Sequence, residues 1–187
     1  MPPHLEIHVA NLALVDAEGL VVAVDGALCL LSGAAFSAVR GAFSADEEQD
    51  VREFFEEKVL ELKPLRNGQA QVVEVDEKWR YLVVTAALLH STAGNVYASD
   101  QHQAAIQRGV ASAVRAAGQA GLASISMSLI GAAARLTVPQ AVSATCRAIA
   151  ACGASSAVVR WCFLSAEDAA VALAEARRIG LHAELFA

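Results

Sequence analysis

The second half of the chain alternates short apolar runs with helical segments, and this alternation constrains the fold more than any other feature. Residues 122–130 and 156–164 are largely apolar and bounded by turn residues, which is typical of buried strands. Ser99, Thr137 and Ser165 each stand where a helix can begin. The helices are predicted to end near Ala117, Gly153 and Gly180. Such alternation predicts a sheet with helices on its faces.

The first half of the chain predicts pairs of strands. Residues 5–10 and 20–24 are short apolar or β-branched runs separated by a polar turn. Residues 69–75 and 81–87 form a second pair, and the charged turn between them indicates a hairpin.

An acidic helix and a short terminal strand complete the expected elements. Ser44 and Glu47 form a capping box that opens a helix, and Pro64 ends it. Its charges are expected to face solvent. The alternating tail at residues 181–187 predicts an edge strand. We therefore expect an α/β fold, a three-layer α/β/α sandwich whose mixed sheet has six or seven strands.

Composition favours a single domain over residues 1–187, because 56% of the chain is hydrophobic and only 18% is charged. A net charge of −6 excludes a basic field, so neither nucleic acid nor an anionic membrane surface is an expected partner. The four cysteines lack metal-binding spacing and are predicted to be buried thiols. The N-terminus has no signal-peptide pattern, which predicts a cytoplasmic protein.

Asp25 is an isolated carboxylate at the start of a long apolar run, residues 20–43. A carboxylate among apolar residues loses hydration unless it has a partner, so it is usually held at an element end or in a site. Three roles are open for it: a structural cap at the strand end, a ligand contact, or a general base. Asp25 and the small residues after it also argue against a membrane span.

The order of elements, together with local patterns, resembles the macro domain family over about residues 5–180. In that family a first-strand Asp precedes the last Asn of an N-A-A-N motif by fourteen positions, and Asn11 and Asp25 are spaced in the same way. Residues 68–73 and 80–84 are similar to the family's G-E-A-V-x-T and K-Y-V-I-H stretches. Residues 124–131, followed by Pro139, are similar to its second glycine-containing loop.

The resemblance implies binding of ADP-ribose or a related nucleotide or nucleoside, without a cofactor, and in some members hydrolysis of ADP-ribosyl derivatives. It implies adenine contact by Asn11 and ribose contact, with a catalytic role, by Asp25. It also implies that the loops around Gly33 and Gly131 face the phosphates. Arg135 can supply a charge there, because a guanidinium suits bidentate phosphate contacts. Ser91 belongs to a polar cluster after the fourth strand, where α/β sheets often meet ligands.

Two departures from the family pattern favour other readings. Each phosphate loop contains one glycine where the family has several, and Asp25 replaces an amide with a charge that repels diphosphate. A ligand poorer in phosphate tolerates this charge better. The alternative is a ligand-free scaffold that acts through a protein partner or a homo-oligomer, as does the macro-like N-terminal domain of leucine aminopeptidases. No G-x-S-x-G, G-x-G-x-x-G or P-loop motif occurs in the sequence.

Overall fold

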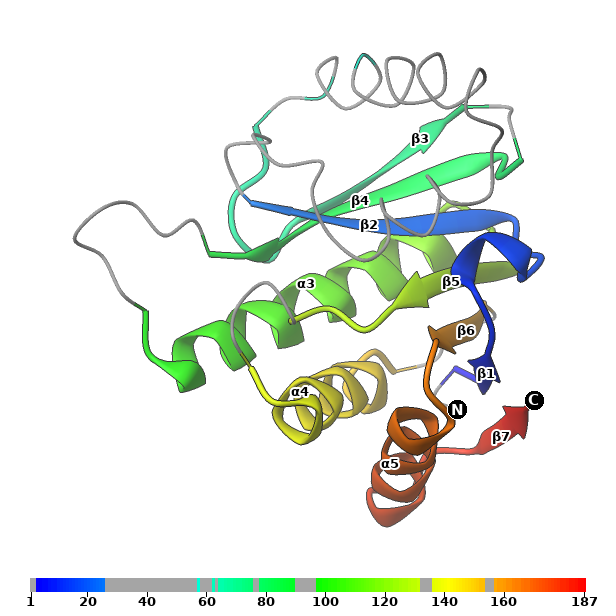
Figure 1. Ribbon diagram of the computed structural model, residues 1–187. Coiled ribbons are helices and arrows are strands. Elements are labelled where there is room, and N and C mark those ends of the chain that lie inside the picture. The colour runs from blue at the N-terminus through cyan, green and yellow to red at the C-terminus, as the bar shows by residue number, and fades with distance from the viewer. Residues whose placement is uncertain are drawn as a thin grey trace, which may run out of the picture.

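The computed structural model of the chain describes residues 3–25, 57, 62, 64–75, 78–89, 97–131, 136–153 and 157–187. Within these residues the strands form one mixed seven-stranded sheet in the order β3-β4-β2-β5-β6-β1-β7 (Figure 1). The strands are β1 (Leu5–Val9), β2 (Gly19–Asp25), β3 (Ala70–Glu74), β4 (Tyr81–Leu88), β5 (Ser124–Ser128), β6 (Val158–Phe163) and β7 (Ala183–Phe186). The helices are the 3-10 turn η1 (Leu12–Leu14), α3 (Ser99–Gln119), α4 (Val138–Ala150) and α5 (Ala166–Arg178).

All neighbouring strands run parallel except β3, which pairs antiparallel with β4. The predicted hairpin at residues 69–87 is therefore confirmed, as are the mixed sheet and the edge strand near the C-terminus. The first two strands of the chain are not neighbours, because β5 and β6 lie between them. The polar turn expected between these strands is preceded by η1.

The helices α3, α4 and α5 all lie on one face of the sheet (Figure 1). Their starts follow from local chemistry: the Ser165 hydroxyl accepts from the Asp168 N–H at 3.4 Å. Gln140 reaches back to the Thr137 N–H at 3.0 Å, and Pro139 occupies the first turn, where it costs no hydrogen bond. All three predicted helices in this half of the chain are confirmed.

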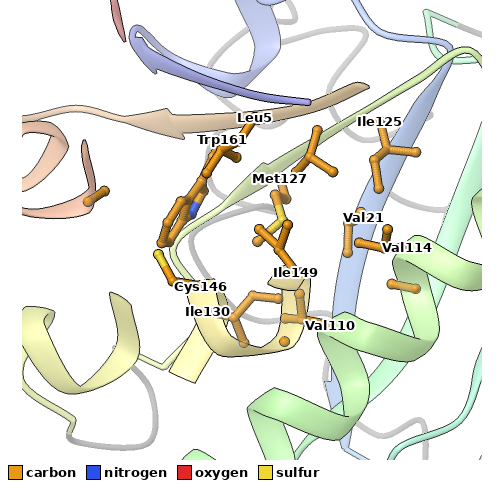
Figure 2. Close-up of a cluster of buried hydrophobic side chains, with 14 of the residues drawn as sticks. Leu5, Val21, Val110, Val114, Ile125, Met127, Ile130, Cys146, Ile149 and Trp161 are labelled. Carbon is orange, nitrogen blue, oxygen red and sulfur yellow. The ribbon is translucent and has the colours of Figure 1, made fainter. Parts of the chain in front are cut away.

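The core between these helices and the sheet consists of buried apolar side chains. Figure 2 shows Val114 of α3 directed toward Val21 of β2, and Trp161 of β6 beside Cys146 of α4. Both Trp161 and Cys146 are fully buried. Burial of this kind is the main favourable term in folding, so this layer fixes the ends of the strands relative to one another.

The closest approach of a helix to the sheet occurs at Gly109 of α3. A Cβ added there would lie 2.4 Å from the Cβ of Ala87 and 2.7 Å from its Cα. The Thr85 hydroxyl donates to the Gly109 carbonyl at 2.8 Å. Gly109 therefore lets the backbone of α3 approach β4 closely, which no larger residue allows without displacement.

The opposite face of the sheet carries a second apolar cluster. Leu20, Val22 and Val24 belong to it, whereas Val21 faces the helices, as the two-residue period of a strand requires. Trp79 and Leu65 also pack into this cluster and are almost fully buried. The acidic helix predicted over residues 46–63 lies outside the described residues, apart from Glu57 and Leu62.

The described cysteines are free thiols, as the sequence predicts. Burial raises the pKa of Cys146 and Cys162 to about 12 and that of Cys152 to about 11. These thiols are poor nucleophiles, since the thiolate is the reactive form. Among the described helices, none has the length and apolarity needed to cross a membrane.

Candidate functional site

One edge of the sheet collects the C-terminal ends of the parallel strands β1, β2, β4, β5 and β6. Ligands of open α/β sheets bind outside this edge, where loops leave the strands. Asn11 follows β1, Asp25 is the last residue of β2, and Gly131 follows β5. The topology thus brings three of the predicted site residues to the same edge.

Asn11 caps the 3-10 turn that follows β1. Its Oδ1 accepts from the Ala13 N–H at 3.0 Å, and the next residues, Leu12 and Ala13, are buried. This bond fixes the turn of the chain at the strand end. The resemblance assigns the Asn11 side chain to contact with adenine. In the structure its Oδ1 already accepts the hydrogen bond that caps η1.

The backbone at Asp25 is irregular. Val24 pairs with Ala86, but the next residue, Asp25, pairs with Leu88, so the register shifts by one residue. Irregular pairing of this kind, β-bulges included, occurs preferentially at sheet margins and beside active sites, where it redirects the chain. Beyond this shift, at the C-terminal ends of the strands, β2 and β4 no longer follow the regular pairing register.

Gly131 has a backbone conformation that favours glycine, with φ at +133°. A Cβ there would lie 3.0 Å from the Cβ of Ala141 and 3.1 Å from Cδ1 of Ile106. The Gly131 carbonyl accepts from the Leu136 N–H at 3.3 Å. Thr137, at the N-cap position of α4, donates its N–H to Oε1 of Gln140 at 3.0 Å. A glycine turn followed by a helix N-terminus is an arrangement that can present backbone N–H groups to an anion.

The other three predicted site residues, Gly33, Ser91 and Arg135, lie outside the described residues. The side chain of Asp25 is likewise outside the described parts of the chain. The described site therefore consists of the Asn11 cap, the register shift at Asp25 and the Gly131 turn.

One exposed apolar residue at the same edge was not singled out by the sequence. Leu164, directly after β6, is 83% exposed. Exposed leucines are common singly, but at the rim of a binding edge they offer apolar surface to a planar base. The only signal in the sequence is the position of Leu164 between a strand and the helix cap Ser165.

A scan against protein families and a search of curated proteins each found no match to the chain. Solved structures do match. A variant of the Oceanobacillus iheyensis macrodomain with ADPR has a TM-score of 0.68 and 15% identity, with 92% of this chain and 91% of that chain covered. The same macrodomain with ADP has a TM-score of 0.64 and 14% identity, with 91% and 88% covered.

The likeness extends to a second organism. The Trypanosoma brucei macrodomain in complex with ADP-ribose has a TM-score of 0.60 and 13% identity, with 95% of this chain and 69% of that chain covered. The chain therefore has the macrodomain fold. This confirms the resemblance and the α/β fold class expected from the sequence.

Proposed function

We propose that the chain binds ADP-ribose or a related nucleotide or nucleoside at the C-terminal edge of its parallel strands. The observation that carries the proposal is the Gly131 turn, whose left-handed glycine leads into the N-terminus of α4 on a macrodomain-fold sheet. Backbone N–H groups at such a turn suit phosphate oxygens. The similar Oceanobacillus iheyensis macrodomain variant with ADPR and the Trypanosoma brucei macrodomain in complex with ADP-ribose support this ligand class.

Each remaining site residue has a role in this proposal. Asn11 and the apolar Leu164 receive the base, and Asp25 accepts hydrogen bonds from ribose hydroxyls. Gly33 and Gly131 line the phosphates, which Arg135 helps to neutralise. Ser91 contributes a hydroxyl from the loop after β4.

The proposal extends to hydrolysis of ADP-ribosyl derivatives. In that reaction the Asp25 carboxylate takes a proton from the water that attacks the anomeric carbon of the ribose. The bond from that carbon to its substituent breaks, and the leaving substituent takes up the proton from Asp25. Release of ADP-ribose from a modified substrate by the wild-type chain, lost in Asp25→Ala, is the expected result. Equal turnover by both chains would remove Asp25 from the reaction.

Thermal unfolding in the presence of ligands tests binding. A ligand at a hundredfold excess over its Kd adds about 2.7 kcal/mol to the unfolding free energy. For a chain of this size that corresponds to an increase in Tm of about 5–10 °C. ADP-ribose, ADP, adenosine and NAD should be compared, and no shift with any of them at millimolar concentration would refute the proposal.

A matched pair of variants ties the effect to the site. Asp25→Asn should change the ligand-induced shift in Tm, whereas Asp16→Asn should leave it unchanged. Asp16 is exposed and precedes β2, at the opposite end of the strand from Asp25. Equal responses of the two variants would contradict the placement of the ligand.

A second candidate function is assembly through the edge strand β7. Leu185 and Phe186 on this strand are 45% and 41% exposed, which is unusual for large apolar side chains at a sheet edge. Size-exclusion chromatography with light scattering should then show an oligomer that Phe186→Glu dissociates. A wild-type monomer would eliminate this function.

A further inference from the structure

Pairing of β1 with β7 brings together two histidines from opposite ends of the chain. Leu5 pairs with Ala183 in a parallel register, and the Leu5 N–H donates to the His182 carbonyl at 3.2 Å. His4 therefore lies beside His182. Their Nδ1 atoms are 2.9 Å apart, and the ring centroids are separated by 4.9 Å.

A carboxylate completes this cluster. Glu184 lies two residues after His182 on β7, so both side chains project from the same face of the strand. The Glu184 Oε1 lies 3.9 Å from Nε2 of His4. One potential ligand atom from each of His4, His182 and Glu184 lies within 4.8 Å of the other two.

The carboxylates of Glu184 and of its cross-strand neighbour, Glu6, have different surroundings. The Glu6 Oε2 accepts from Nε of Arg160 at 2.9 Å and lies 3.1 Å from Nε2 of His8. Glu6 is thus compensated by a cation. Glu184 instead faces the two imidazoles and is 54% exposed, so its side chain can adjust.

We propose that His4, His182 and Glu184 bind a zinc ion. Two imidazole nitrogens and a carboxylate are a known ligand set for zinc, and they leave a fourth position for water. Zinc–nitrogen bonds of about 2.0–2.1 Å place two donors of a tetrahedral site roughly 3.3 Å apart. The two Nδ1 atoms need to separate by only a few tenths of an ångström from their present hydrogen bond.

The protons balance without a further reactant. In the Nδ1–Nδ1 hydrogen bond one neutral ring carries its proton on Nδ1 and the other on Nε2. Zinc binding through both Nδ1 atoms moves the first proton to Nε2 of its own ring, so no proton is lost from neutral imidazoles. One carboxylate and one divalent ion leave the site with a single positive charge.

The zinc site lies away from the proposed nucleotide site. His4 and His182 precede β1 and β7, at the N-terminal ends of these parallel strands, whereas Asp25 ends β2 and Gly131 follows β5. β7 pairs with β1 alone in the described sheet. Zinc would therefore hold the edge strand onto β1, which adds stability by mass action and does not depend on nucleotide binding.

Calorimetric titration of the untagged full-length chain with zinc chloride tests the proposal. The expected result is one saturable site and a rise in Tm on zinc addition. Cobalt(II) in place of zinc should give the intense visible absorption of a four-coordinate ion. Absence of binding heat in a large molar excess of zinc would overturn the proposal.

Variants locate the ion. His182→Ala and Glu184→Gln should each weaken zinc binding by more than about tenfold, the least that even an outer-shell partner usually costs. Both residues are exposed, so the variants should fold. His8→Ala is the matched control on the same face of β1 and should bind zinc as the wild type does. Wild-type affinity in His182→Ala, or an equal loss in His8→Ala, would contradict the assignment.

Discussion

Replacement of Gly109 by alanine tests how closely α3 approaches the sheet. The added Cβ would lie 2.4 Å from the Ala87 Cβ and 2.7 Å from the Ala87 Cα, and the latter is backbone that cannot rotate away. Overpacking of this kind costs about 1–3 kcal/mol. Alanine gains about 1 kcal/mol over glycine in helix propensity. Because backbone has to move and the hydrogen bond from Thr85 is strained, we expect a net loss of about 2 kcal/mol.

Urea unfolding followed by circular dichroism measures this loss. A decrease of about 2 kcal/mol corresponds to a lowering of Tm by roughly 4–8 °C in a chain of this length. Ala87→Gly removes one of the two clashing atoms, so Gly109→Ala should cost about 0.5–1 kcal/mol less in that background. A neutral or stabilising effect of Gly109→Ala, as helix propensity alone predicts, would refute the close approach.

Three further substitutions have defined outcomes. Asp25→Asn should raise the affinity for ADP-ribose by roughly fivefold, because about 1 kcal/mol of repulsion between the carboxylate and the diphosphate is removed. The affinity for adenosine, which has no phosphate, should stay unchanged, and calorimetry measures both. Gly131→Ala should lower the unfolding free energy by about 1–3 kcal/mol in urea, since φ is +133° there. Hydrogen bonds from Arg178 lower the pKa of Glu175 to about 2 from an ordinary value of 4.5. The folded state favours the ionised form of Glu175. The contribution of this carboxylate to the unfolding free energy is therefore complete above the unfolded pKa and is lost as the pH falls toward 2. Glu175→Gln should reduce the change of unfolding free energy between those two pH values by at most about 1 kcal/mol. The effect is small because Arg178 is 62% exposed and solvent screens the pair. If the unfolding free energy of this variant falls at low pH as much as that of the wild type, the Glu175–Arg178 pair is not the cause of the fall.

Local signals in the sequence predict the elements of the fold well. The capping pattern at Ser165 and the helix start at Thr137 identify the beginnings of α5 and α4, because the bonds that form these caps span only three residues. The hairpin β3–β4 is likewise local. The alternating tail predicts β7, although its parallel partner β1 lies at the other end of the chain.

The parts that escape prediction depend on contacts distant in sequence. The His4–His182 pair joins residues 178 positions apart and exists only because β7 adds to β1 in one register. The role of Gly109 depends on Ala87 of another element. For the candidate site, the resemblance supplies Asn11, Asp25 and Gly131, but the capping bond of Asn11 and the exposure of Leu164 require the structure.

Isothermal titration of the full-length chain with ADP-ribose tests the proposed nucleotide site most directly. Saturable binding at one site, displaced by ADP or adenosine and altered in Asp25→Asn but not in Asp16→Asn, is the expected result. No measurable heat with ADP-ribose, ADP or adenosine at millimolar concentration would contradict nucleotide binding at this edge of the sheet.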